Sequence, residues 1–479
     1  MTVHDPFGSR PQPPRARARV AARRRPADGW LARQWRRHPA PELAGLWLIE
    51  VLACAALVYL LLSGGGGGGL GAADKAVVLA LTFGVTSLAV GLYSPDTYLE
   101  TRLLLVNTAV GAALAFPLLW AVGRLVGSDL VGLTAHGGMR ALLAWTLLLF
   151  GLRLGFSWAL RADMFVRRVL IVGPDAAANR LADTIRTVRR GFFEVSAVLP
   201  VEEAAALVGG RVPERRLWGV ILADAAADTL PARVLLRAQA RGLRLYTDSE
   251  FWERQLRRID VDRNAAADAV IGGEEPSGQE RAPEGLAAAP RRLFDIALSL
   301  TMLVFTLPLM LLTALAIKLD SPGPALYRQE RVGLGGRRFT LLKFRSKHTD
   351  AEACGPVWAA QRDPRVTRVG SLIRLIRVDE LPQLLNILRG EMSFIGPRPE
   401  RPHFVAQLER VMPCYVERSR VKPGLTGWAQ VNYPYGASVE DARAKLSYDL
   451  YYVKHRGLLL DLLILLATVR VVLFQRGAR

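Results

Sequence analysis

Residues 374–398 read RLIRVDELPQLLNILRGEMSFIGPR, and the rest of the chain is organised around this stretch. Two acids stand side by side in it, Asp379 and Glu380. Pro382 follows in what the pattern predicts to be the first turn of a helix, where its missing N–H costs nothing. Leucines at helical spacing give this helix an apolar face, and Gly390 is placed to end it. We therefore expect Asp379 at the helix N-cap, where exposed N–H groups and the helix dipole favour its ionised form.

The acid pair lies among basic residues, and the turn GPRP that ends the stretch is expected to hold its arginine outward. The basic residues are Arg374, Arg377, Arg398, Arg401 and, upstream in LLKFRS, Lys343 and Arg345. Two adjacent carboxylates resist double ionisation unless a cation lies between them, and Mg²⁺ prefers one or two carboxylates with phosphate oxygens. Arginine binds phosphate with two hydrogen bonds, and a carboxylate can attack phosphorus directly. The pattern indicates a phosphate site with Mg²⁺ held by Asp379 and Glu380. The alternative is an N-capping aspartate followed by a glutamate that suits a first helical turn.

Composition bounds the class of protein. The chain has 479 residues, enough for two or three domains; 51% of them are hydrophobic, and the formal net charge is +20. The hydrophobic content indicates membrane segments, and the positive charge suits nucleic acid, anionic lipid or phosphorylated substrates. We expect no nucleic acid, because the sequence has no zinc-finger spacing, RNP-like aromatic motif or basic heptad region. The cysteines Cys54, Cys354 and Cys414 form no metal-ligand spacing or disulfide framework, which fits a reducing cytoplasm.

The N-terminal part is predicted to be a membrane domain. Residues 1–41 are rich in Arg and Pro and are expected to form a disordered, basic cytoplasmic tail that touches anionic lipid. Residues 42–162 are predicted to hold four transmembrane helices, so that the chain returns to the cytoplasm. The apolar stretches are 43–62, 76–93, 103–126 and 141–160. Glu50 and Arg153 lie within them, and we expect a pair inside the bundle or at its interface rather than a functional site.

Residues 163–271 are predicted to form an α/β Rossmann-like domain, because strands alternate with helices in the manner of a parallel sheet. The expected strands are 166–173, 195–199, 217–223 and 243–247, and the expected helices are 176–190 and 231–241. The turn that begins at Gly173 keeps one glycine of the dinucleotide-binding fingerprint and lacks the others. We therefore expect a structural or regulatory domain rather than a dinucleotide site.

Residues 272–290 are rich in Gly, Pro and Glu and are predicted to be a linker. A fifth apolar segment, 293–318, contains Pro308 and has basic residues at both ends, which places both ends in the cytoplasm. We expect a re-entrant helix that enters one leaflet, breaks at Pro308 and returns. Asp295 is expected to pair with Arg291, four residues before it.

Four segments further along share a pattern: KFRS (343–346), VDELPQLLNILRGEMSFIGPRPE (378–400), VKPGLTGWAQVNY (421–433) and KLSYDLYYVKHRGLLLDLLILLATV (445–469). Together they resemble the bacterial sugar transferases, the monotopic polyprenyl-phosphate phosphoglycosyl transferases that start exopolysaccharide and O-antigen synthesis. Several ordered motifs that match together are specific, whereas one alone would be weak. The resemblance covers about the last 190 residues closely, and the whole chain loosely as the long, exopolysaccharide form of the family.

This resemblance implies a membrane protein with an α-helical N-terminal bundle, an α/β Rossmann-like middle domain and, at 291–479, an α+β monotopic catalytic domain with a re-entrant membrane helix. It implies the bacterial inner membrane, with the catalytic domain on the cytoplasmic face, and we expect a homodimer. The family often has Ser-Pro at the helix break, where this chain has Leu-Pro at 307–308. Many members have Asn-Gly-Arg where this chain has Asn-Tyr-Pro at 432–434, so no arginine contact carries over there.

The resemblance also implies a reaction. Asp379 attacks the β-phosphate of a UDP-sugar, releases UMP and carries the phosphosugar until undecaprenyl phosphate, presented by the membrane, takes it. Mg²⁺ neutralises phosphate charge, and Glu380 positions it or acts as a base. The substrate-binding residues that it implies are Lys343, Arg345, Arg374, Pro397, Arg398 and, for a uridine or metal contact, Asp449. The sugar stays open, because specificity depends on the shape of the pocket.

Two other function classes stay open. A membrane-anchored nucleotide-sugar oxidoreductase or epimerase would use the middle domain and would need an intact glycine fingerprint and a catalytic Tyr/Lys pair; NAD binding to residues 166–270 would favour it. A non-enzymatic scaffold for polysaccharide assembly is the other. Rescue of a deletion strain by an Asp379→Ala variant would favour the scaffold.

Overall fold

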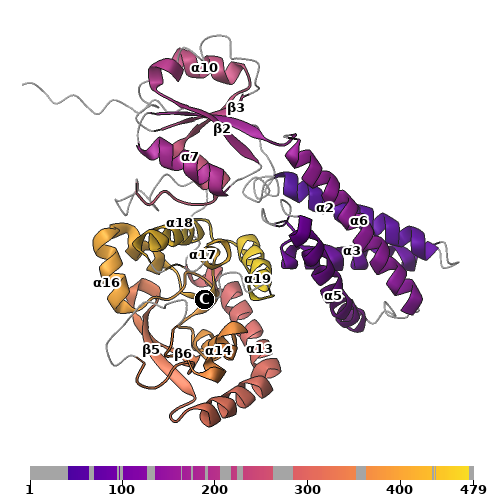
Figure 1. Ribbon diagram of the computed structural model, residues 1–479, viewed down its shortest axis with the longest axis vertical. Coiled ribbons are helices and arrows are strands. Elements are labelled where there is room, and N and C mark those ends of the chain that lie inside the picture. The colour runs from indigo at the N-terminus through magenta and orange to yellow at the C-terminus, as the bar shows by residue number, and fades with distance from the viewer. Residues whose placement is uncertain are drawn as a thin grey trace, which may run out of the picture. The chain divides into compact units, whose positions relative to one another are not determined.

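The structure of the chain is a computed structural model (Figure 1). It describes residues 41–63, 70–93, 97, 101–126, 135–162, 164–173, 176–188, 192–204, 217–223, 230–262, 284–351, 363–433, 436 and 438–473. Nearly all of the predicted basic tail, most of the predicted linker and Cys354 lie outside the described residues.

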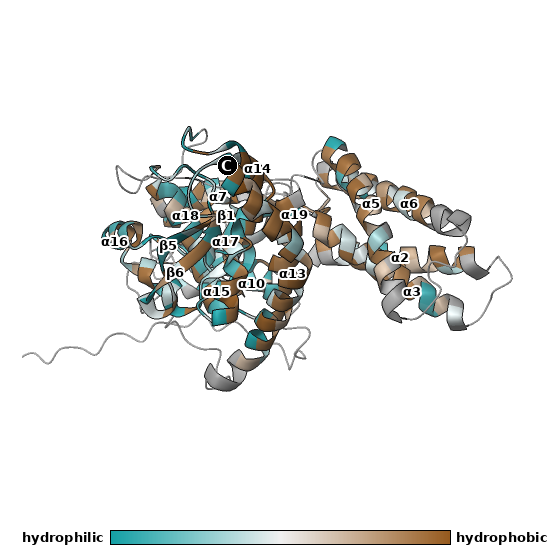
Figure 2. Cartoon of the chain, turned by 90° about the horizontal axis from the view of Figure 1, so that it is seen from below, coloured by the Kyte–Doolittle hydropathy of each residue, from teal (hydrophilic) through white to brown (hydrophobic). Residues whose placement is uncertain are grey.

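Four apolar helices come first: α2 (Pro41–Ser63), α3 (Leu70–Val90), α5 (Thr101–Val126) and α6 (Ala135–Arg161). They confirm that the four predicted apolar stretches are helical. By length and composition, windows in α3, α5 and α6 are able to cross a membrane, as is a window in the later helix α13, whereas α2 has a shorter apolar window. Figure 2 shows the hydrophobic colouring along these helices. The chain is therefore a membrane protein.

The predicted pair of intramembrane charges is confirmed. A guanidinium nitrogen of Arg153 lies 2.7 Å from a carboxylate oxygen of Glu50, and both side chains are buried. Arg153 also donates to the Leu92 carbonyl at 2.6 Å, and the Tyr93 hydroxyl donates to the same Glu50 oxygen. The pair therefore joins α2 and α6 inside the helical part.

A four-stranded parallel sheet follows, as predicted, in the order β2-β1-β3-β4. Its strands are β1 (Arg167–Val172), β2 (Phe193–Leu199), β3 (Leu217–Leu222) and β4 (Arg244–Thr247), and its main helices are α7 (Ala176–Val188) and α10 (Ala232–Ala240). The strand order reverses between β1 and β3, so right-handed crossovers place α7 and α10 on opposite faces, as Figure 1 shows.

The chain then passes α11 (Asp248–Phe251) and the π-helical turn η1 (Trp252–Leu256). Directly after that turn, the buried side chains of Ile259 and Val261 are part of the core of the C-terminal region. The Ile259 N–H donates to the Ser447 carbonyl at 3.0 Å. The C-terminal region therefore takes part of its core from residues that precede the predicted linker.

The C-terminal region mixes helices with two small sheets. The elements are α13 (Glu284–Asp320), β5 (Leu326–Val332), β6 (Arg338–Phe344), α14 (Arg368–Leu375), η3 (Val378–Glu380), α15 (Gln383–Arg389), β7 (Ser393–Ile395), α16 (Pro402–Val411), η4 (Pro413–Arg420), β8 (Gly424–Thr426), α17 (Trp428–Asn432), α18 (Val439–His455) and α19 (Leu458–Leu473). The strands β5 and β6 form an antiparallel hairpin whose turn contains three glycines. A buried core joins α15, β7, α16, α18 and α19.

Helix α13 differs from the prediction in two ways. It begins at Glu284, inside the predicted linker 272–290, because the run of leucine and alanine before Pro290 favours a helix. It also continues through Pro308, where a break was predicted; Figure 1 shows that α13 instead changes direction part-way along. Most of its apolar surface is exposed, with Phe305 the most exposed phenylalanine at 78%.

The predicted pair between Arg291 and Asp295 is wrong. One oxygen of Asp295 accepts hydrogen bonds from the Ser393 hydroxyl and the Phe394 N–H, both at 3.0 Å. Arg291 donates to Asp461 of α19 at 3.1 Å. The Asp295 side chain is buried against β7. There it accepts from the backbone N–H of Phe394, which would otherwise be buried without an acceptor.

Candidate active site

The acid pair lies in η3, a single 3₁₀ turn between α14 and α15. Asp379 is not the N-cap of a helix: Pro382 caps α15, and no side chain bonds to its first N–H groups. Two 3₁₀ hydrogen bonds, one from the Glu380 N–H to the Arg377 carbonyl at 3.3 Å, close the turn before the proline. Arg377 enters the turn with φ 60°, a left-handed conformation that is uncommon outside glycine. The N-capping alternative is therefore wrong, while Gly390 ends α15 at φ 85° as predicted.

Glu380 is held by three cations. Its Oε1 accepts from Arg398 at 2.6 Å and from Lys343 at 3.4 Å, and an Arg377 nitrogen lies 3.9 Å from the same oxygen. Burial by itself raises the pKa of Glu380, but the charges of Arg398 and then Lys343 outweigh it and hold that pKa well below its usual range. Glu380 is therefore ionised near neutral pH.

Asp379 has a different environment. Within the part of the chain that the structure describes, its carboxylate accepts no hydrogen bond. Burial and then the adjacent charge of Glu380 raise the pKa of Asp379, against the charges of Lys343, Arg398 and Arg374. Among the described residues, the Asp379 carboxylate thus shares no lone pair in a hydrogen bond, although it lies beside a cluster of cations.

A large cavity of about 1750 Å³ opens over the cluster. Its charged part is lined by Lys343, Arg374, Asp379, Glu380, Arg398 and Asp449. It continues along apolar side chains of α13 and α19, among them Phe294, Met302, Leu465 and Val469. One cavity therefore offers a charged region and an apolar region to the same substrates.

The two basic residues of LLKFRS have different hydrogen-bond partners. Lys343, on β6, faces Glu380, and burial lowers its pKa. Arg345 also lines the cavity, but its guanidinium donates to the Ser321 carbonyl at 2.8 Å and the Pro322 carbonyl at 2.5 Å. The structure therefore brings Lys343 to the acid pair and commits Arg345 to the turn after α13. Substrate binding by Arg345 stays a prediction.

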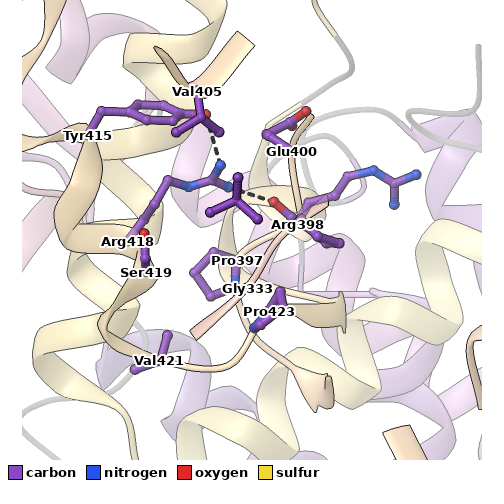
Figure 3. A pocket seen from close by; sticks show the side chains of 12 residues that line it. Gly333, Pro397, Arg398, Glu400, Val405, Tyr415, Arg418, Ser419, Val421 and Pro423 are labelled. Carbon is purple, nitrogen blue, oxygen red and sulfur yellow. Dashed lines mark hydrogen bonds between the residues drawn. The ribbon is translucent and has the colours of Figure 1, made fainter. Parts of the chain in front are cut away.

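A second, smaller cavity lies beside the first (Figure 3). It is lined by Pro397, Arg398, Tyr415 and Arg418, among others. The sequence analysis did not predict Arg418 or Tyr415. Arg418 is twenty residues after Arg398, and no sequence spacing indicates that its side chain contacts the Arg398 backbone. Asp449, predicted to contact uridine or metal, accepts from Arg418 at 2.8 Å and is buried.

The acid pair fits Mg²⁺ by its chemistry. In the described part of the chain no group of three or more His, Cys, Asp or Glu residues could hold a metal by itself. Among the described residues no hydrogen bond uses either Asp379 carboxylate oxygen, and the contacts of Glu380 all use Oε1, which leaves Oε2. Two carboxylates with further ligands from phosphate and water are the donors that Mg²⁺ prefers.

Comparison with known proteins decides the family. The family model described as bacterial sugar transferase matches residues 286–475, which include every site residue above. A UDP-glucose:undecaprenyl-phosphate glucose-1-phosphate transferase of Caulobacter vibrioides is 44% identical over 181 residues, which are 37% of this chain and 68% of that protein. This chain belongs to the bacterial sugar transferase family. The resemblance of the four sequence segments is thereby confirmed.

Two further family members show similar identity over a smaller share of their own length. A UDP-N-acetylgalactosamine-undecaprenyl-phosphate N-acetylgalactosaminephosphotransferase of Aeromonas hydrophila is 47% identical over 265 residues, 55% of this chain and 60% of that protein. An undecaprenyl-phosphate glucose phosphotransferase of Komagataeibacter xylinus is 45% identical over 194 residues, 39% of this chain and 36% of that protein. The matched region thus spans less than two thirds of either. The names differ in the sugar and agree on undecaprenyl phosphate.

Proposed function

We propose that this protein transfers a sugar-1-phosphate from a UDP-sugar to undecaprenyl phosphate, giving undecaprenyl-diphosphate-sugar and UMP, as the first membrane step of exopolysaccharide or O-antigen synthesis. The observation that carries the proposal is the Asp379 carboxylate, which accepts no hydrogen bond in the described part of the chain and lies among cations in a cavity that also has an apolar region. The names of the three relatives support the acceptor.

In the first half-reaction, an Asp379 oxygen attacks the phosphorus that bears the sugar. The bond from that phosphorus to the bridging oxygen breaks, UMP leaves with the electron pair, and a phosphosugar stays on the carboxylate as an acyl phosphate. Lys343, Arg374 and Arg398 line the charged part of the cavity, where they bind phosphate oxygens and stabilise charge that moves to the leaving group.

In the second half-reaction, a phosphate oxygen of undecaprenyl phosphate attacks the same phosphorus. The bond to Asp379 breaks, which restores the carboxylate and completes the diphosphate. Glu380 is a poor proton acceptor, because Arg398 and Lys343 hold its pKa low. We therefore assign Glu380 to positioning these cations rather than to acid–base chemistry.

Asp379 and Glu380 are the residues that would hold Mg²⁺ together with the phosphates of the donor. When bound, Mg²⁺ would neutralise phosphate charge during transfer. The oxygens available for it are those that Arg398 and Lys343 leave unused.

A re-entrant arrangement of α13 is supported by its contacts. Near one end, Arg292 donates to the carbonyls of Ile387 and Leu388, both at 2.5 Å, and at the other end Asp320 accepts from the Val369 N–H at 3.1 Å. A helix that crossed the bilayer would separate these ends by the full membrane thickness. Both ends would then lie on the cytoplasmic face of the inner membrane, where the water-soluble donor and the lipid acceptor meet.

The test is a panel of UDP-sugars, each offered with undecaprenyl phosphate to the full-length protein in detergent. We expect release of UMP with at least one sugar, and at least a thousandfold loss in a folded Asp379→Asn variant, about the range for removing a catalytic nucleophile. Release of UDP instead would mean that the sugar moves without its phosphate and would contradict the proposal, as would a near-normal rate in Asp379→Asn.

A further inference from the structure

Each residue from Gly396 to Pro399 has a backbone group in a hydrogen bond with another part of the chain. The Gly396 N–H donates to the Thr426 carbonyl and the Gly424 N–H to the Pro397 carbonyl, both at 2.9 Å. The carbonyl of Arg398 itself accepts from the Arg418 side chain at 2.9 Å, and that of Pro399 from Arg331 at 3.0 Å. Proline on each side further restricts the chain, because the residue before a proline is confined to extended conformations.

Arg418 makes this contact as part of a buried group. Its guanidinium donates to Asp449 Oδ2 at 2.8 and 3.2 Å and to the Tyr415 hydroxyl at 2.8 Å. Figure 3 shows the guanidinium between Tyr415 and the Arg398 backbone, while the Arg398 side chain extends away from it. Among the described residues, the contact of Arg418 with the Arg398 carbonyl connects it to the acid pair, because Nη2 of Arg398 lies 2.6 Å from Glu380.

The Arg418 and Asp449 side chains are 11% and 4% exposed. A buried ion pair adds little net stability relative to apolar residues of the same size, because both charges lose their water. What such a pair supplies is a fixed geometry: Asp449 and Tyr415 hold the planar guanidinium, and one of its two remaining N–H groups donates to the Arg398 carbonyl.

We propose that Asp449 and Arg418 are positioning residues for the transfer reaction: through the Arg398 carbonyl they fix the Arg398 guanidinium against Glu380, which leaves Asp379 unpaired and ready to attack. This role rests on the proposed function and differs from the expected contact of Asp449 with uridine or metal: Arg418 already occupies Oδ2 of Asp449 with two hydrogen bonds.

The test is a double-mutant cycle on UMP release. Asp449→Asn should lower kcat about tenfold, the middle of the range for coupled residues, with KM for the UDP-sugar changed less than about twofold. In an Arg398→Ala background the same substitution should cause less than about a twofold further loss, because the group it acts through is gone. Arg418→Lys, which keeps the charge and loses the fork, should behave like Asp449→Asn.

Arg420→Lys is the matched control, because Arg420 lies in the same η4 and pairs with Glu417 instead; its kcat should equal that of wild type. An Asp449→Asn loss that appears in KM, or that multiplies with the loss in Arg398→Ala, would overturn the proposal and return Asp449 to direct substrate contact.

A structure of the Asp449→Asn variant tests the positioning role without any measurement of activity. The Arg398 guanidinium should leave hydrogen-bond distance of Glu380; an unchanged contact would overturn the positioning role. Failure of the wild type to release UMP would instead contradict the proposed function and leave this structural reading intact.

Discussion

Asp379 and Glu380 are neighbours in sequence, yet their surroundings give them different chemistry. Three cations share one oxygen of Glu380, so its charge is already compensated. Asp379 accepts no hydrogen bond among the described residues, and burial together with Glu380 raises its pKa. The pair is thus divided into a carboxylate that organises cations and a carboxylate that can react.

This division predicts opposite pH effects for two substitutions. The nucleophile must be ionised, so activity is lost as pH falls through the pKa of Asp379. Glu380→Gln removes a charge that raises this pKa and should move the acid limb of kcat/KM to lower pH. Lys343→Met removes a charge that lowers it and should move the limb to higher pH, each by about one pH unit.

The measurement is UMP release across the acid range. Arg338→Met is the control, because Arg338 lies on the same strand as Lys343 but pairs on the surface with Glu330; its limb should match the wild type. Shifts of the same sign in Glu380→Gln and Lys343→Met would contradict the assignment of Asp379 as the titrating group.

The site could be predicted in part from residue types and order. The acid pair, Lys343, Arg374 and Arg398 are brought together as expected, because clustered charges and a proline-bounded turn leave a clear pattern. Arg418 could not be found in this way. Its role depends on one hydrogen bond to a backbone carbonyl, and any residue type offers such a carbonyl.

At the scale of elements, strong hydrophobic periodicity predicts the helices and strands correctly, whereas local turn residues do not predict where helices begin. The apolar helices and the four parallel strands were predictable, because long apolar runs and alternating strands and helices have few alternatives. The 3₁₀ turn at Asp379 was mistaken for a helix N-cap, since an acid before a proline suits either. The start of α13 was placed too late, because proline and glycine nearby resembled a linker.

The re-entrant arrangement of α13 predicts which side of the membrane its ends face. In a background in which the native cysteines are replaced by serine, Ala289→Cys and Lys318→Cys place thiols at exposed positions near the two ends. A membrane-impermeant thiol reagent should label both in inside-out vesicles and neither in intact spheroplasts. Labelling of one end from each side would show that α13 crosses the bilayer.

At the scale of the molecule, charges buried between helices join distant parts of the chain. Arg153 and Glu50 are 103 positions apart and connect α6 with α2. Removing one partner of a buried pair leaves an uncompensated charge, whereas replacing both with apolar residues restores balance.

We therefore expect Arg153→Leu alone to lower the free energy of unfolding by about 3–5 kcal/mol. The double variant Glu50→Leu/Arg153→Leu should lose less than the single variant. Thermal unfolding in detergent micelles measures both. A double variant less stable than Arg153→Leu would contradict a purely structural role for the pair.

The family match extends over residues 286–475 and contains the whole candidate site. The parallel sheet and the first four helices lie outside it, and the predicted homodimer stays a prediction. Under the proposed function a soluble donor and a lipid acceptor must reach one carboxylate, which would account for a cavity with a charged region and an apolar region.

The most direct test of this account is to trap the intermediate. Wild-type protein is incubated with a UDP-sugar labelled in the sugar and without undecaprenyl phosphate, quenched in acid, and digested for mass spectrometry. We expect a phosphosugar on the peptide that contains Asp379, absent in Asp379→Asn and present in Glu380→Gln, and lost on adding undecaprenyl phosphate before the quench. Turnover by the wild type with no label on that peptide, or label that persists in Asp379→Asn, would contradict the central claim.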